Sequence, residues 1–399
     1  MTTTPASHGP PTDPTAQRSP RGAPKAHVAH RSGRGAWCTI RQVRSSAPRR
    51  ISVRQVAQTA RHVRTESATA PDSARHVTSR LTTRIADLAV RMQRSGVTTR
   101  VVWITDTQLD QSLELSERLK MENVREGIFT VANKLYGLNF KKIDNIPVYN
   151  PEVETYEVTD ADGSFLAVFY TDYFPRPGKS GGAWMSTFRE QWVENEVDIR
   201  PLVYNVANFT RPTEQLPSLL TLDEVETMFH EFGHALHGML SKVNYKGVSC
   251  TNVYRDFVEL PSQINEHWAF HPEVLKLYAK HYQTGETIPD SLIEKINNAA
   301  YFNQGFMTTE LVAAALLDMD WHTQTQQQSF DVRKFEKESM EKIGLIPEII
   351  PRYRSTYFTH IFSGGYSAGY YSYLWSEVLD ADAFQPFVEK GIFHRETAQ

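Results

Sequence analysis

The sequence has little cysteine, no long apolar run and no secretory leader. Its two cysteines, Cys38 and Cys250, lie in parts of the chain with very different composition, so they are poor candidates for a disulfide and fit a reducing compartment. No apolar stretch approaches the roughly 18 residues of a transmembrane helix, and no charged segment followed by an apolar one marks a signal peptide. These absences predict a cytoplasmic protein without a membrane partner.

The first hundred residues lack phenylalanine and tyrosine, although the whole chain has 20 Phe and 17 Tyr. They hold 18 Lys and Arg against 4 acidic residues, a net charge of +14, while the remainder carries about −17. Such a segment buries too little apolar surface to offset its loss of conformational entropy. We therefore expect residues 1–108 to form a disordered basic arm, with at most a weak helix over residues 79–94, and residues 109–399 to form the folded domain.

The arm is open to several interpretations. Its Arg- and Ser-rich, acid-poor composition resembles a transit peptide, although it is long and begins with a proline-rich stretch. A basic arm can also bind nucleic acid, but the first hundred residues have a single Trp and lack the interleaved aromatics on which bases stack, so nucleic acid is not the expected partner. A native disordered arm and an out-of-frame translation product are the remaining interpretations.

The strongest motif is H-E-x-x-H at residues 230–234. On a helix, residues four apart lie on one face, so His230 and His234 can both bind one zinc ion. Glu231 can then act as the general base toward a water that the metal activates, as in metallopeptidases. The alternative is an ordinary amphipathic helix with surface histidines, because so short a motif also arises by chance.

The residues around the motif predict a helix. Thr221 and Glu224 have the spacing of a capping box. Apolar residues then recur at steps of three and four, namely Leu222, Val225, Phe229, Phe232, Leu236 and Leu240. Gly233 costs a helix about 1 kcal/mol relative to Ala, so we expect a backbone or a substrate to pass close to it.

A zinc site of this kind needs a third ligand. His237 is one candidate, although packing or support of another ligand is the preferred interpretation. A metzincin would need Gly and His where this chain has His237 and Leu240, so that class is excluded. A carboxylate from a later helix would complete a two-histidine, one-glutamate set. Glu259 and Glu266 both qualify, since residues seven apart face the same way, and Pro261 predicts that their helix begins or kinks there.

H-E-F-G-H-A-L-H at residues 230–237, followed by R-D-F-V-E-L-P-S-Q-I-N-E-H-W at residues 255–268, resembles the thimet-oligopeptidase family of zinc metallopeptidases. The N-E-H-W-A ending is most similar to the peptidyl-dipeptidase (dipeptidyl carboxypeptidase) branch. The resemblance extends from about residue 113 to residue 399 and includes further motifs at residues 121–127, 179–185 and 360–373.

The resemblance implies a single zinc ion held by His230, His234 and Glu259, with Glu231 as the base and Glu266 in a supporting or structural role. Members of the family carry several hundred residues of helical domain before the part seen here. We therefore expect residues 109–399 to be a partial catalytic domain, and the dissimilarity of the arm to that domain is the reason to consider out-of-frame translation.

The stretch from His360 to Tyr373 forms the third group of candidate residues. Tyr366, Tyr370 and Tyr373 would share one face of a helix, a pattern that by itself indicates core packing. The resemblance implies instead that this segment covers the substrate and that His360 and the tyrosine hydroxyls stabilise an oxyanion. Which hydroxyl acts is left open, because the loop is one residue longer than in some family members.

The expected fold class is mostly α: a helical, zincin-like catalytic domain with a small β-sheet beside the H-E-x-x-H helix. Strands are predicted at residues 149–158 and 165–173. Helices are predicted at residues 119–135, 272–284, 290–302, 308–322, 332–343 and 369–384. The family resemblance implies that substrate backbone pairs with an edge strand, for which residues 165–173 are the candidate.

The expected function is zinc-dependent hydrolysis of short peptides with release of C-terminal dipeptides. Arg352 and Arg354 are candidates to bind the free carboxylate, although a structural role is the preferred interpretation for both. The alternatives are an endo-acting oligopeptidase of the same family, and an inactive fragment or basic nucleic-acid-binding protein. The sequence does not predict the oligomeric state.

Overall fold

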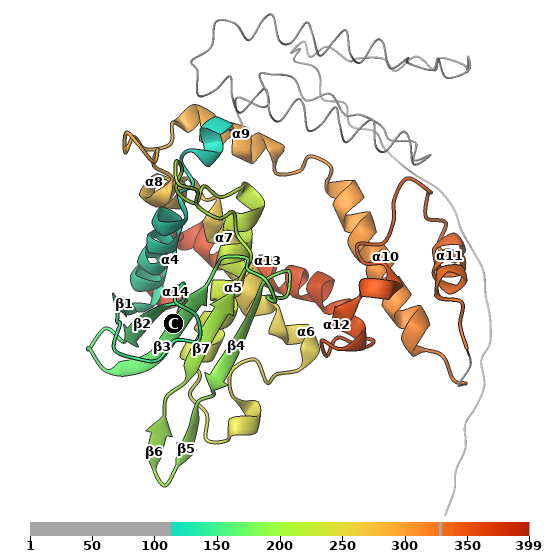
Figure 1. The fold of residues 1–399 in the computed structure, drawn as a ribbon, viewed down its shortest axis with the longest axis horizontal. Helices are drawn as coiled ribbons and strands as arrows, with labels where there is room; N and C mark the ends of the chain where they lie inside the picture. Colours follow the sequence, from blue (N-terminus) through green and yellow to red (C-terminus); the bar gives the residue numbers. More distant parts are fainter. Residues whose placement is uncertain (1–112, 327–328, 399) are drawn as a thin grey trace, which may run out of the picture. The chain divides into compact units, whose positions relative to one another are not determined.

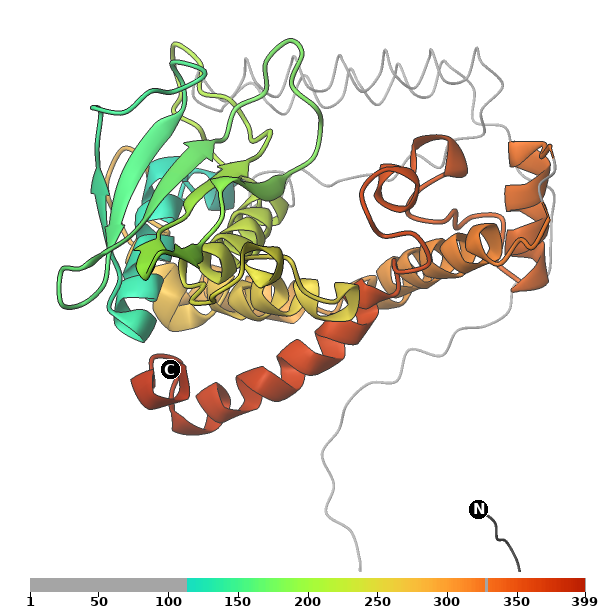
Figure 2. The same cartoon turned by 90° about the horizontal axis from the view of Figure 1, so that it is seen from below.

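The described part of the chain, residues 113–326 and 329–398 of a computed structural model, is mostly helical with a small sheet, as expected (Figures 1 and 2). Its helices are α4 (Met121–Tyr136), α5 (Leu222–Met239), α6 (Arg255–Val258), α7 (Leu260–Ala269), α8 (Pro272–Tyr278), α9 (Asp290–Ala299), α10 (Gln304–His322), α11 (Val332–Lys342), α12 (Thr359–Phe362), α13 (Ser372–Lys390) and α14 (Arg395–Ala398). None of these helices is both long enough and apolar enough to cross a membrane.

The main sheet has five strands in the order β1-β2-β3-β7-β4. The strands are β1 (Asn139–Lys142), β2 (Glu154–Thr159), β3 (Phe165–Asp172), β4 (Trp184–Arg189) and β7 (Leu202–Val206). Strand β3 pairs antiparallel with β2 and parallel with β7, whereas β4 pairs antiparallel with β7 alone. A separate ribbon joins β5 (Trp192–Glu194) to β6 (Val197–Ile199).

This order corrects the expectation that residues 165–173 pair with substrate. Both long edges of β3 are already hydrogen-bonded to neighbouring strands, so a peptide cannot be added there. The strands at the two edges of this sheet are β1 and β4. Neither could be assigned to an edge from the sequence, because strand order depends on long-range pairing.

Helix α5 carries the H-E-x-x-H motif and begins as predicted. The Thr221 hydroxyl accepts a hydrogen bond from the Glu224 N–H, and the Glu224 carboxylate accepts one from the Thr221 N–H. The helix packs against β3, β4 and β7, and Figure 2 shows the sheet and helices α4 and α5 as neighbouring layers. Phe232, on the sheet side of α5, lies 5.6 Å from Phe169 and 5.9 Å from Phe129 between ring centroids.

Helices α5 and α7 approach each other most closely at Gly233. A Cβ atom added there would lie 2.3 Å from the carbonyl oxygen of Pro261 and 2.6 Å from the Cα of Ser262. The expected close passage is therefore made by the backbone of α7. The Asn265 side chain fixes the same contact by donating to the carbonyl of Phe229 at 2.7 Å.

Two predicted helices differ from the structure in ways that have local causes. The helix predicted to reach residue 284 ends at Tyr278, because the chain turns at His281 and Gly285, whose φ is +75°. The helix predicted at residues 369–384 begins only at Ser372 and continues to Lys390. Ala368 has φ +52°, which interrupts a right-handed helix.

A second, smaller core lies between α10 and the segment that precedes α13. It contains Ala314 and Ala315 of α10 together with Phe358, Ile361 and Tyr370. The weak helix predicted at residues 79–94 and the basic arm lie outside the described residues.

Candidate metal centre

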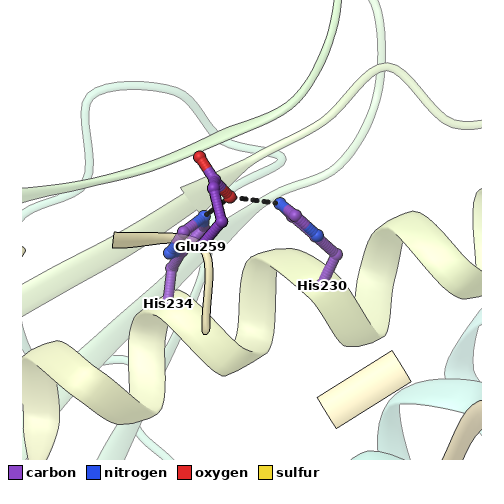
Figure 3. A group of neighbouring side chains, drawn as sticks. All are labelled: His230, His234 and Glu259. Carbon is purple, nitrogen blue, oxygen red and sulfur yellow. Dashed lines mark ion pairs between the residues drawn. The ribbon is translucent and has the colours of Figure 1, made fainter. Parts of the chain in front are cut away.

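His230 and His234 project from successive turns of α5 toward one carboxylate (Figure 3). The Nε2 atoms of His230 and His234 lie 3.3 and 3.1 Å from Oε2 of Glu259. Their possible ligand atoms all lie within 4.8 Å of one another, so the three side chains can hold one metal ion. These are the three residues that the family resemblance selects.

Glu259 reaches the histidines because the helical structure is interrupted at this residue. Helix α6 ends at Val258 and α7 begins at Leu260, with Pro261 in its first turn. The Glu259 side chain is 1% exposed, and its Oε2 also accepts a hydrogen bond from the Ser262 hydroxyl at 3.1 Å. The predicted helix start at Pro261 is confirmed, and this start directs Glu259 toward α5.

Glu266 occupies the other side of His230. Its Oε1 lies 2.6 Å from the His230 Nδ1, which places the ring proton on Nδ1 and turns Nε2 toward Glu259. Burial lowers the pKa of His230, but Glu259 and Glu266 outweigh it and raise that pKa well above its usual value. Burial acts oppositely on Glu259, yet the two histidines hold its pKa well below the usual range.

Glu231 lies beside these residues with its carboxylate buried. Its Oε2 has no hydrogen-bond partner within the described residues. Burial raises the pKa of Glu231, although His230 and His234 partly offset the effect. A buried carboxylate with a raised pKa and a free oxygen is suited to accept a proton.

A cavity of about 330 Å³ opens over this group. Its residues come from the sheet edge, from α5, from the α6 region and from the stretch before α13, and are Ala183, Trp184, Met185, His230, Glu231, His234, Thr251, Arg255, Val258, Glu259, Thr359, His360, Gly364, Tyr366 and Tyr373. The cavity therefore brings together the motifs at residues 179–185, 230–237, 255–268 and 360–373.

The loop before β4 is anchored by Lys179. Its ammonium group donates to Oδ1 of Asp172 at 3.0 Å and to the carbonyl of Phe174 at 2.8 Å. The Asn208 amide donates to the carbonyls of Ser180 and Gly182 at 2.9 and 2.8 Å. This motif carries no titratable group that reaches the cavity, and its contribution is to position the start of the edge strand.

The tyrosines gather as predicted but not on a helix face. Tyr366 and Tyr370 precede α13, while Tyr373 lies in its first turn, and the Tyr366 and Tyr373 rings stack at 5.5 Å. The Tyr366 hydroxyl donates to Oε1 of Glu259. Burial raises the pKa of all three phenols, so they stay protonated and able to donate.

His360 and Tyr370 lie at different distances from the cavity. His360 lines it, and burial lowers the pKa of its ring, which favours the neutral form. Tyr370 is 2% exposed and packs behind the cavity against Phe358 and Tyr353, at centroid distances of 4.8 and 6.0 Å.

The two arginines considered for the substrate carboxylate lie elsewhere. Arg354 is paired with the carboxylate of Glu336, and neither Arg352 nor Arg354 lines the cavity. Among the described residues that line it, Arg255 alone carries a permanent positive charge. Its guanidinium lies 4.4 Å from the centroid of the Tyr366 ring. The sequence placed Arg255 four residues before Glu259 but did not indicate that its charge lies at the cavity.

Comparison with known proteins agrees with the family that these motifs indicate. The model of peptidase family M3 matches residues 54–399, and the chain belongs to that family. The match begins before residue 113 and so includes part of the arm. Dipeptidyl carboxypeptidase of Escherichia coli K12 is 48% identical over 295 residues, which cover 73% of this chain and 42% of that protein.

Two further relatives show the breadth of the similarity. Oligopeptidase A of Salmonella typhimurium is 39% identical over 276 residues, or 68% of this chain and 41% of that protein. Thimet-like oligopeptidase of Dictyostelium discoideum is 34% identical over 302 residues, or 74% of this chain and 44% of that protein. The family resemblance is thus confirmed, and the chain spans about two fifths of the length of these relatives.

Proposed function

We propose that the protein is a zincin-like, zinc-dependent peptidase that releases dipeptides from the free C-terminus of short peptides. The observation that carries the proposal is the convergence of His230, His234 and Glu259, with Glu231 beside them, at one wall of a cavity. A cytoplasmic location remains a prediction from the sequence.

The donor set fits zinc. Two ligands at about 2.0–2.1 Å from a tetrahedral ion lie roughly 3.3 Å apart, and the two histidine nitrogens lie 3.3 and 3.1 Å from the Glu259 oxygen. Two imidazoles and one carboxylate form the set that catalytic zinc sites use while leaving a position open for water. When bound here, zinc would lower the pKa of water toward about 7 and polarise the scissile carbonyl.

The chain's own residues supply proton transfer and orientation. Glu231 accepts the proton of the attacking water and delivers it to the leaving amine. Glu266 holds the His230 ring in its working tautomer by accepting from Nδ1. Tyr366, Tyr373 and His360 line the cavity. Tyr373 and His360 can donate there to the oxyanion that develops on the carbonyl, and Tyr366 can do so once its hydroxyl leaves Glu259.

Tyr370 has a different place in this proposal. The family resemblance implies a role for it in stabilising the oxyanion, together with the other tyrosines. Since its ring lies behind those of His360 and Tyr373, at centroid distances of 5.6 and 5.1 Å, we propose that it supports these two residues.

The substrate backbone is proposed to add to β4. Within the described part of the chain one edge of this strand is unpaired, and the strand begins with Trp184 and Met185, both of which line the cavity. Pairing along such an edge binds a peptide through its main chain and leaves side-chain preference broad.

Dipeptide release requires a cation that recognises the free C-terminal carboxylate. Arg255 is the proposed partner, because its fork of donors matches a carboxylate and its charge lies in the cavity. The relatives named dipeptidyl carboxypeptidase support this specificity, whereas those named oligopeptidase A support endo-acting cleavage as the second candidate.

Mass spectrometry of the products separates the two candidates. The zinc-loaded protein is given a free-acid peptide and the same peptide as its C-terminal amide. We expect dipeptide release from the acid and at least about tenfold slower cleavage of the amide. Equal cleavage of both, or cuts at interior bonds, would favour the oligopeptidase, and no zinc-dependent cleavage would favour an inactive fragment.

A further inference from the structure

Asp318 of α10 is a fully buried carboxylate that no motif singled out. Its exposed fraction is 0%, and it lies within the helix, one turn before His322. A buried carboxylate is costly unless its oxygens are hydrogen-bonded, so the partners of Asp318 indicate what it stabilises.

Both oxygens of Asp318 bind the backbone of the tyrosine loop, defined here as residues 363–371. Oδ1 accepts from the N–H of Ala368 and Oδ2 from the N–H of Tyr370, each at 2.9 Å. His322 completes the arrangement, with its Nδ1 at 2.7 Å from Oδ1. The carboxylate thus joins α10 to the loop at two positions, Ala368 and Tyr370.

The anchored positions hold Tyr366 in place. The N–H of Gly369, between the two anchored amides, donates to the carbonyl of Tyr366 at 2.8 Å. Ala368 has φ +52°, a conformation that residues with a side chain rarely adopt and that surrounding contacts must maintain. The Tyr366 hydroxyl in turn reaches Glu259 at the metal centre.

We propose that Asp318 is a positioning residue, which sets the orientation of the Tyr366 hydroxyl through the tyrosine loop. The proposal rests on the proposed peptidase function, because its effect on catalysis passes through Tyr366. It assigns to α10 a part in the active site although none of its residues lines the cavity.

The substitution that tests this role is Asp318→Asn, which keeps the shape of the side chain. One amide oxygen can accept from one backbone N–H, while the amide NH₂ faces the other, so one anchor is lost. We expect kcat to fall about 10- to 100-fold toward a quenched fluorescent peptide with a free C-terminal carboxylate, with a smaller change in KM and unchanged zinc content.

Asp320→Asn is the matched control. Asp320 lies two residues further along α10 and accepts from Ser339 and Lys342 of α11 at 2.7 and 2.9 Å. The same chemical change on the same helix therefore loosens α11 but not the tyrosine loop. We expect it to leave kcat within about twofold.

A double-mutant cycle separates positioning from a general structural role. In the Tyr366→Phe background, Asp318→Asn is expected to change kcat by less than about twofold, because the hydroxyl through which it acts is absent. An additive loss of 10-fold or more in that background would overturn the proposal. If Asp318→Asn does not fold, His322→Ala removes only the third partner of Asp318, at a partly exposed position. We expect His322→Ala to lower kcat about threefold in the wild-type background and to have no further effect in the Tyr366→Phe background.

Hydrogen exchange gives a readout independent of activity. Asp318→Asn is expected to speed exchange of the Ala368 and Tyr370 amides at least tenfold, whereas Asp320→Asn leaves both unchanged. Unchanged protection in Asp318→Asn overturns the proposal. If Asp318→Asn exchanges faster but the zinc-loaded wild-type chain cleaves no peptide, the peptidase function is overturned while the role of Asp318 in the loop is retained.

Discussion

At the scale of the residue, Glu231 is distinguished from its neighbours by what it does not contact. His230, His234 and Glu259 bond to one another or to Glu266, whereas one oxygen of Glu231 has no partner within the described residues. A group that is held in place but retains a free oxygen is available for proton transfer, which is the role proposed for it.

Glu231→Gln therefore removes the base while leaving the three proposed ligands intact. We expect normal zinc content and peptide hydrolysis slower by about 10²- to 10⁴-fold, the usual contribution of a general base. Zinc is measured by atomic absorption on the same samples used for kinetics. Turnover close to wild type in a fully zinc-loaded variant would contradict the role.

The two glutamates near His230 differ in what they face. Glu259 contacts both histidines, while Glu266 contacts only Nδ1 of His230, the nitrogen that points away from Glu259. These positions indicate that Glu259 is a ligand and that Glu266 orients the ligand His230.

Glu259→Ala is expected to abolish stable zinc binding, and Glu266→Ala to weaken it by about 10- to 100-fold, the usual effect of losing a residue that orients a ligand. Titration with a chelator of known affinity measures both constants. A larger loss in Glu266→Ala than in Glu259→Ala would exchange the two assignments.

At the scale of the element, the site depends on how closely α5 and α7 pack. Gly233 lets the Pro261 carbonyl lie against α5, and Glu259 enters the site just before this contact. The glycine lowers the intrinsic stability of α5, but it permits the position of Glu259, the third proposed ligand.

Gly233→Ala should therefore destabilise the protein although alanine favours a helix. The added Cβ would lie 2.3 Å from backbone, so α7 must shift, at a cost of about 1–3 kcal/mol in the free energy of unfolding. Gly238→Ala, on the same helix, meets the flexible end of Met185 instead, and should cost less. Urea unfolding compares the two, and equal stability would show that the close contact with α7 is unimportant.

At the scale of the whole molecule, the cavity joins segments that are far apart in sequence. The edge strand, the H-E-x-x-H helix, the interruption at Glu259 and the tyrosine loop together span residues 183–373.

The chain also covers only about two fifths of its relatives' length. Apolar side chains of the described residues are exposed near α10 and on α13. Tyr301 and Phe302 are 85% and 76% exposed, and Trp375 and Val378 are 51% and 62% exposed.

Features that depend on local spacing could be predicted from the sequence. The capping box and the apolar repeat were sufficient to place α5, because helix formation depends on residues three and four apart. The same spacing put His230 and His234 on one face. The choice of Glu259 over Glu266 came from the family resemblance, since residues seven apart are equivalent on a regular helix.

Features that depend on long-range contacts became clear from the three-dimensional fold. The strand order places residues 165–173 inside the sheet and leaves β1 and β4 at its edges. This order could not be predicted, because the sequence of one strand does not show which strands it pairs with. The left-handed Ala368 placed Tyr366 and Tyr370 before α13 rather than on it. The positions of Arg255 against Tyr366 and of Asp318 against the tyrosine loop depend on packing between distant segments, which neither the motif at residues 255–268 nor helical periodicity indicates.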